Sequence, residues 1–163
     1  MLQRMETVIM ADSNKIFHMR RWGNRKITLQ REYEADCRST DNKNVLQGGI
    51  YNVNFGTNLG KEVDKNRPAI VVSNQQFNNR KNGLIVVAPL TGTVVLKKNG
   101  YPKYDYHFVL KKNDYNFLEK DSTIEFNHVR SVSSKRIDSE SPYGFVDSST
   151  LNVILDKFKR FFR

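Results

Sequence analysis

Two short runs of β-branched and other apolar residues most constrain how this chain can fold. They are residues 68–73 (PAIVVS) and 84–90 (LIVVAPL), and the polar segment 78–83 (NNRKNG) lies between them. Each run has the length of a strand, and an uninterrupted apolar run is typical of a strand buried on both faces. The polar segment has the composition of a turn. We therefore predict two buried strands with a turn between them.

Further strand patterns flank this pair. Residues 50–55 (IYNVNF) alternate apolar with polar side chains, which predicts a half-buried strand. Residues 56–66 form a long polar loop, and residues 106–110 and 122–132 predict two or three more strands. Several short strands with no helix between most of them predict a small antiparallel barrel that is closed or nearly closed.

The chain is predicted to end in an amphipathic helix. Its apolar residues recur three and four positions apart: Leu151, Ile154, Leu155, Phe158, Phe161 and Phe162. Ser148 or Ser149 stands where the N-terminal cap of this helix is expected. With this helix, the predicted fold class is α+β and mainly β.

A helical extension is predicted before the barrel. Residues 13–36 show a weak helical pattern that Gly23 and Asn24 interrupt. This predicts two short helices, or one interrupted helix, with Ser13 as the cap. The polar segment 38–44 is predicted to be a linker. The chain therefore divides into an extension, 1–47, and a domain, 48–163.

The charge of the chain favours a polyanionic partner. Its 27 Lys and Arg against 17 Asp and Glu give a net charge of +10, which suits nucleic acid or an acidic protein. The alternative is that these charges only solvate the surface. The single cysteine, Cys37, excludes a disulfide framework within the chain, and no histidine stands in a metal-ligand motif. We therefore predict no metal and no cofactor.

The localisation is also predicted from the sequence. No apolar stretch reaches the roughly 18 residues that a membrane span needs, and the N-terminus lacks the apolar core of a secretory signal. We therefore expect a cytoplasmic protein that has no membrane association.

Four segments resemble the MazF/PemK family of toxin endoribonucleases in their order and spacing. They are residues 49–56 (GIYNVNFG), 59–74 (LGKEVDKNRPAIVVSN), 86–91 (VVAPLT) and 121–137 (DSTIEFNHVRSVSSKRI). With the terminal helix, the resemblance covers residues 48 to about 162. It implies an SH3-like barrel of the MazF/CcdB type and a homodimer. It also implies the toxin of a type II toxin-antitoxin system, an mRNA interferase that cuts single-stranded RNA selectively without a metal. A cognate acidic antitoxin would inhibit it.

The resemblance assigns catalysis to Arg67 and Thr91. The guanidinium of Arg67 stays charged and presents a planar set of donors to a phosphate. The alternative for Arg67 is an ion pair with Glu62 or Asp64 of the loop. Thr91 ends a buried strand, where its hydroxyl and nearby backbone N–H groups can hold a phosphate oxygen. Its alternative is a local turn bond.

Other positions depart from the family pattern. Asn127 stands where an acidic residue is common and cannot act as a base, and His128 stands where a glutamine is common. His128 is a candidate for proton transfer, and its alternatives are stacking on a base or pairing with Asp121. Lys61 and Lys65 are expected to contact phosphates. The full set of predicted substrate-binding residues is Lys61, Glu62, Lys65, Asn74, Thr93 and Asn127.

Two roles are open for the extension. We favour docking of its helical segment on the barrel or on a dimer, through the apolar residues Ile16, Met19, Trp22 and Ile27. The alternative is an arm that contacts RNA or another partner through the basic residues Arg20, Arg21, Arg25 and Lys26.

Two other functions compete with the nuclease. One is a barrel of the CcdB type, which grips DNA gyrase and cuts no RNA. The other is an RNA-binding module that Asn127 leaves inactive. Cleavage of RNA without a metal separates the nuclease from both. The cleavage sequence depends on loop shape, which one sequence does not fix.

Overall fold

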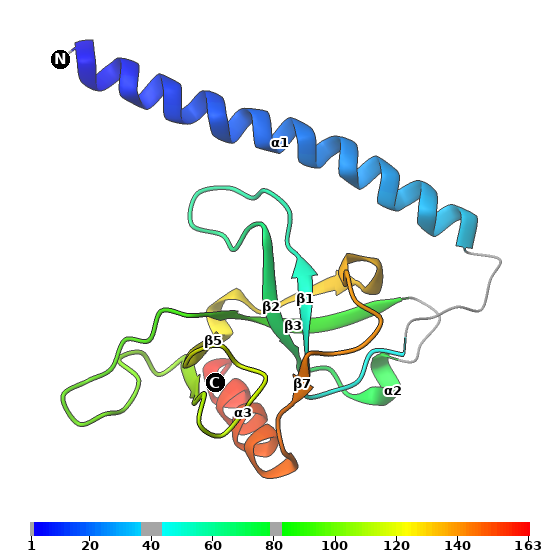
Figure 1. Ribbon diagram of the computed structural model, residues 1–163, viewed down its shortest axis with the longest axis vertical. Coiled ribbons are helices and arrows are strands. Elements are labelled where there is room, and N and C mark those ends of the chain that lie inside the picture. Colours follow the sequence, from blue (N-terminus) through cyan, green and yellow to red (C-terminus); the bar gives the residue numbers. More distant parts are fainter. Residues whose placement is uncertain (1, 37–43, 79–82) are drawn as a thin grey trace. The chain divides into compact units, whose positions relative to one another are not determined.

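The computed structural model describes residues 2–36, 44–78 and 83–163, with side chains from residue 14 onward (Figure 1). Its elements are α1 (Leu2–Asp36), β1 (Gly49–Asn54), β2 (Asn66–Val71), α2 (Gln75–Asn78), β3 (Leu84–Thr91), β4 (His107–Leu110), β5 (Ser122–Glu125), the 3-10 turn η1 (Phe126–His128), β6 (Arg130–Ser133), the 3-10 turn η2 (Ser134–Arg136), β7 (Gly144–Phe145) and α3 (Ser148–Phe161). They form two compact units. One contains α1 with the loop 55–65, and the other contains the strands and the remaining helices.

The strands form one curled antiparallel sheet. Its order is β4-β5-β3-β2-β1-β7, and β6 pairs with β3. Val87 of β3 is paired with Val71 of β2 on one edge and with Arg130 of β6 on the other. A bridge from Val53 to Ile137 then joins the segment after β6 back to β1. The sheet is thus a half-barrel, which confirms the predicted fold class.

The two apolar runs form the centre of this sheet. Residues 69–72 are buried, and so are residues 87–90 of β3, as expected for strands with protein on both faces. The predicted bounds of these strands are correct within two residues. The predicted turn begins in α2, which the sequence pattern did not indicate, and residues 79–82 lie outside the described residues. Strand β7 was also not predicted.

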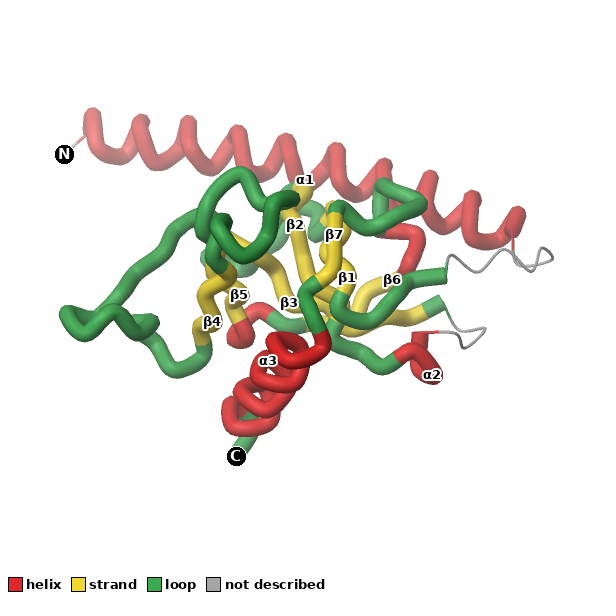
Figure 2. The backbone as a smooth tube through the Cα atoms, turned by 60° about the horizontal axis from the view of Figure 1, so that its bottom comes forward, coloured by secondary structure: helices red, strands yellow, loops and turns green. Residues whose placement is uncertain are grey.

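Helix α3 packs on one side of the sheet, as predicted (Figure 2). Ile154 is fully buried there among Ile50, Ile70 and Phe126. The cap of the helix is Asp147, so the prediction of Ser148 or Ser149 is wrong. The carboxylate of Asp147 accepts the Thr150 N–H at 2.9 Å. A negative charge at this end also suits the helix dipole.

Helix α1 is continuous, so the predicted interruption at Gly23 and Asn24 and the predicted cap at Ser13 are wrong. A glycine inside a helix costs only about 1 kcal/mol relative to alanine. Strong helix formers such as Arg20, Arg21 and Gln30 surround it and offset that cost. Most of the predicted linker, residues 38–43, lies outside the described residues. Among the described helices, none combines the length and the apolar character of a membrane span.

Trp22 attaches α1 to the loop 55–65. A Cβ atom on Gly56 would lie 2.1 Å from Cε2 of the Trp22 ring, so the indole rests directly on this glycine's backbone. Lys15 adds an ion pair to Asp64 at 3.1 Å. The other residues that were expected to dock, Ile16, Met19 and Ile27, are exposed. Of the predicted docking set, only Trp22 is buried.

Replacing Gly56 by alanine should expose Trp22. Gly56 has φ +82°, which an L-residue rarely adopts, and the new methyl group would overlap the indole. Trp22 is the only tryptophan, so its fluorescence reports on this contact alone. We expect a red-shifted emission and stronger quenching by acrylamide. Gly60→Ala is the matched control, because Gly60 also has a positive φ but nothing lies within 4 Å of its Cβ position. Equal spectra for the two variants would contradict the packing.

Candidate functional site

The two predicted catalytic residues lie on neighbouring strands. Arg67 is in β2 and is half-buried, and Thr91 ends β3. Ala69 of β2 pairs with Pro89 of β3 in antiparallel register. Side chains alternate between the two faces of a strand, so residues two positions away from this pair share its face. Arg67 and Thr91 therefore project from the same face of the sheet.

Thr91 begins a tight turn. Its Oγ1 accepts the N–H of Thr93 at 3.3 Å, and the carbonyl of Thr93 accepts the Thr123 hydroxyl at 3.0 Å. The local turn bond that was the alternative role of Thr91 is thus present. It uses the hydroxyl oxygen as an acceptor, so the proton of the same hydroxyl can still be donated to a ligand. The two roles of Thr91 are compatible.

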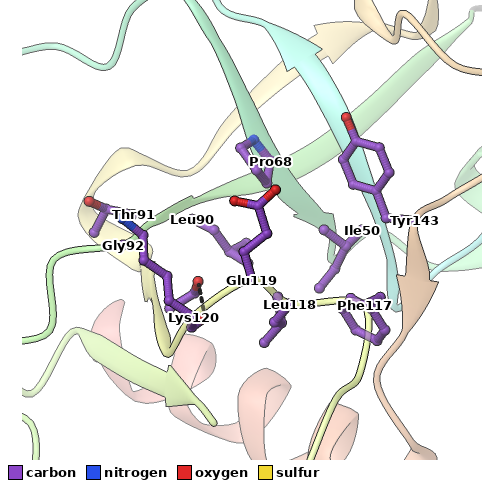
Figure 3. A pocket seen from close by; sticks show the side chains of 11 residues that line it. Ile50, Pro68, Leu90, Thr91, Gly92, Phe117, Leu118, Glu119, Lys120 and Tyr143 are labelled. Carbon is purple, nitrogen blue, oxygen red and sulfur yellow. Dashed lines mark hydrogen bonds between the residues drawn. The ribbon is translucent and has the colours of Figure 1, made fainter. Parts of the chain in front are cut away.

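A pocket of about 440 Å³ adjoins this strand end (Figure 3). Its floor contains apolar side chains of three strands, Ile50, Pro68 and Leu90. The segment before β5 supplies the wall, residues 117–120, and Tyr143 lies at the end of the pocket where Phe117 also lies. The volume is within the range of roughly 300–1,000 Å³ that is usual for sites of small ligands. Figure 3 shows Thr91 at the edge, with its hydroxyl pointing away from the pocket centre.

Lys120 lies across the backbone that follows Thr91. A Cβ atom on Gly92 would lie 2.0 Å from Cε and 2.5 Å from Nζ of Lys120. The lysine side chain thus lies directly against the backbone of Gly92. The Ser122 hydroxyl donates to the Lys120 carbonyl at 3.1 Å, which fixes the turn that carries the lysine. Lys120 therefore places a positive charge beside the end of β3.

The remaining pocket residues combine aromatic rings with one carboxylate. The Phe117 ring rests on the backbone of Gly144, where a Cβ atom would lie 2.1 Å from the ring. Tyr143 is 54% exposed, and its backbone N–H donates to the Ile50 carbonyl at 2.8 Å. Glu119 is exposed, and in Figure 3 its carboxylate points across the pocket toward Pro68. Sequence reasoning missed this wall, because no local pattern shows that residues 117–120 fold against the end of β3.

His128 lies in a different cluster. Its charge opposes protonation of His107, which is buried in β4 opposite Glu125 of β5. Burial lowers the pKa of His107, Glu125 raises that pKa, and His128 lowers it again. The ring of His107 packs edge-on against Tyr104 and Tyr106, with centroids 5.1 and 4.8 Å away. His128 does not line the pocket.

The predicted substrate-binding residues are dispersed. Asn127 is exposed in η1, and the Asn74 side chain accepts the Phe77 N–H at 2.8 Å, which caps α2. Lys61, Glu62 and Lys65 are exposed on the loop 55–65, which belongs to the other unit. That loop leads through Asn66 into Arg67.

The loop carboxylates have partners within the α1 unit. The Glu62 carboxylate accepts the Leu59 N–H at 3.4 Å, and Asp64 is paired with Lys15. Lys65 has φ +64°, and its carbonyl accepts the Phe55 N–H at 2.9 Å at the base of the loop. In the described parts of the chain, no three His, Cys, Asp or Glu side chains come together as a metal site would require.

Comparisons with known proteins agree with this fold. A profile of the family described as "PemK-like, MazF-like toxin of type II toxin-antitoxin system" matches residues 46–162. No curated protein matches the chain significantly in sequence.

Solved structures with the same fold include three bacterial proteins. MazF from Deinococcus radiodurans is 20% identical, with a TM-score of 0.57 over 72% of this chain and 96% of that one. An endoribonuclease from a mycobacterial species, in complex with its cognate antitoxin, is 16% identical, with a TM-score of 0.52 over 71% and 92%. The toxin MazF-mt6 of Mycobacterium tuberculosis is 14% identical, with a TM-score of 0.52 over 70% and 95%. At these identities the likeness concerns the fold.

Proposed function

The chain belongs to the PemK-like, MazF-like toxin family of type II toxin-antitoxin systems, and from this premise we propose that it is an endoribonuclease that cuts single-stranded RNA without a metal. The observation that carries the proposal is the placement of Arg67 and Thr91 on one face of neighbouring strands. A guanidinium and a hydroxyl on one face suit the two needs of phosphate chemistry, which are a fixed cation and a fixed hydrogen-bond donor.

The proposed reaction is an internal transfer within the RNA. The 2′-hydroxyl oxygen forms a bond to the adjacent phosphorus, and the bond from phosphorus to the 5′ oxygen breaks. The 2′ oxygen loses its proton and the departing 5′ oxygen gains one, which leaves a 2′,3′-cyclic phosphate and a 5′-hydroxyl. Negative charge increases on the phosphate oxygens in the transition state. Arg67 and Thr91 would stabilise that charge.

The rest of the chain supports an anionic substrate. Lys61 and Lys65 border Arg67 in sequence and would contact phosphates, and Asn74, Thr93 and Asn127 would contact other groups of the RNA. Proton transfer by His128 stays a prediction, because this residue lies with His107 rather than at the pocket. We further propose that the toxin is a cytoplasmic homodimer. A cognate acidic antitoxin would compete with RNA for the positive surface.

Cleavage of RNA in the presence of EDTA tests the proposal. We expect the full chain to cut a long single-stranded RNA in about 10 mM EDTA, which removes Mg²⁺. The rate should equal the rate with Mg²⁺, because side chains supply the positive charge. The products should carry 2′,3′-cyclic phosphate ends, which polynucleotide kinase treatment and gel mobility identify. A strict need for Mg²⁺ would refute the mechanism. Absence of cleavage, together with inhibition of DNA gyrase, would favour the CcdB-like alternative.

A further inference from the structure

The pocket beside Thr91 has the composition of a nucleobase site. Aromatic rings that flank a cavity stack on unpaired bases, and RNA is read mainly through bases that leave the stack in this way. Phe117 packs on the backbone of Gly144, and Tyr143, the residue before Gly144, is 54% exposed at the same end of the pocket (Figure 3). The apolar floor, Ile50 and Leu90, would cover a ring edge. A volume of about 440 Å³ accommodates a base together with its ribose.

Two charged groups of opposite sign indicate how a nucleotide would be oriented in this pocket. The ammonium group of Lys120 lies over Gly92, at the end of β3. Glu119 is the adjacent residue, yet its carboxylate points to the other end of the pocket, toward Pro68. A nucleotide would therefore bind with its phosphate at Lys120 and its base toward Glu119.

The carboxylate selects among the bases. An ionised carboxylate only accepts hydrogen bonds, so it favours a base edge that donates. Guanine presents two parallel donors on its Watson–Crick edge, the N1–H and the 2-amino group, which match the two carboxylate oxygens. Cytosine and adenine present an amino donor beside a ring nitrogen that accepts. The second carboxylate oxygen would face the lone pair of that nitrogen and be repelled by it. Uracil presents one donor between two carbonyls. Guanine is thus the complementary base.

We propose that residues 117–120 and Tyr143 form a guanine-binding subsite beside the end of β3. Its role in RNA cleavage rests on the proposed nuclease function, but its affinity for guanine does not. Glu119 is the specificity residue of this subsite, and Lys120 contacts the phosphate. Both residues lie in the folded unit that contains Thr91, so the subsite needs no part of the loop 55–65.

Binding of mononucleotides tests the subsite directly. We would titrate 5′-GMP, 5′-IMP and 5′-UMP into the full chain and follow the protein resonances by NMR. IMP differs from GMP only by the missing 2-amino group. We expect GMP to bind roughly tenfold or more tightly than IMP and UMP. The latter two lack the 2-amino group and so lose one hydrogen bond to the charged carboxylate of Glu119. Equal affinities for GMP and IMP would overturn the proposal.

Two variants assign the roles of the charged residues. Glu119→Gln should abolish the difference between GMP and IMP, because an amide cannot accept two parallel donors. Lys120→Met should lower the affinity for GMP and for IMP to the same extent, because the contact with the phosphate does not depend on the base. The matched controls are Glu140→Gln and Lys112→Met, two exposed positions outside the pocket, which should leave all affinities unchanged. A Glu119→Gln variant that keeps the preference for GMP would refute the assignment.

The outcomes separate this inference from the nuclease proposal. Selective binding of GMP with no cleavage of RNA would support the subsite and refute the nuclease. Cleavage of RNA with equal binding of GMP and IMP would support the nuclease and refute the subsite. If both hold, the sites of cleavage in a random RNA pool should share a guanine at one fixed position, and Glu119→Gln should remove that preference.

Discussion

Replacing Arg67 by alanine should lower the rate of RNA cleavage by at least about 10²-fold. The transition state gathers negative charge on the phosphate, and Arg67 is the strand-anchored cation on the face that it shares with Thr91. Its backbone is fixed by pairing with Val53 of β1, so the charge is placed before the substrate arrives. Initial rates on a short fluorescent RNA at saturating concentration would measure the loss.

Two further variants make this result specific. Arg67→Lys keeps the charge but loses the planar set of donors, so it should recover only part of the rate. Arg160→Ala is the matched control, because it removes an exposed arginine from the last turn of α3, which packs on the other face of the sheet. It should leave the rate within about threefold of the parent protein, as expected for a surface change away from the reacting groups. Equal rates for Arg67→Ala and the parent would refute the catalytic role of Arg67.

The sequence predicted the central strands well because their signal is local. Residues 68–73 and 84–90 are apolar without interruption, and only a buried strand accommodates such a run in a chain of this kind. The two residues of β7 have no such pattern. Gly144 and Phe145 become a strand only because β1 offers them a free edge at Gly49 and Ile50. Pairing of this kind depends on tertiary structure, which a local pattern does not encode.

The errors at the helices have a different origin. A glycine in a helix is a modest energetic cost rather than a stop, so the pattern at Gly23 overstated the break. The cap of α3 was misplaced by one or two residues, because aspartate and serine are both good capping residues and the sequence does not rank Asp147, Ser148 and Ser149. In the structure, Tyr115 also donates to the Asp147 carboxylate at 2.6 Å. The Ser149 hydroxyl lowers the pKa of Asp147 most, and this long-range contact with Tyr115 lowers it further and favours the aspartate as the cap.

The sequence could predict the residues of the candidate site only where they lie in segments that match the family. Arg67 and Thr91 stand in segments that match the family, so the resemblance could indicate both. Lys120 and Glu119 stand in no such segment, and their importance follows from the close approach of Lys120 to Gly92. Such an approach joins residues 28 positions apart and leaves no trace in composition or periodicity. The contact of α1 with the loop 55–65 was predictable in part, because Trp22 is the kind of residue that is seldom left in solvent.

Replacing Thr91 by valine should lower the cleavage rate by about 10²–10³-fold, as the loss of one preorganised donor does in other enzymes. Valine has the same shape, so the change keeps the packing at the end of β3 but removes the hydroxyl together with its bond from the Thr93 N–H. Thr91→Ser is the matched control, since it keeps the hydroxyl and should retain most of the rate. Thermal unfolding should confirm that both variants fold. A valine variant as active as the serine variant would show that the hydroxyl takes no part.

The double variant Arg67→Ala, Thr91→Val decides whether the two residues act on one phosphate. When two groups stabilise the same transition-state charge, removing either one already loses most of the rate acceleration that they provide together. The rate losses of the two single variants therefore do not multiply in the double variant. We expect the double variant to be slower than Arg67→Ala by at most about tenfold, although Thr91→Val alone costs more. If the two losses instead multiplied in full, Arg67 and Thr91 would act independently, and the shared face of β2 and β3 would not be one catalytic surface.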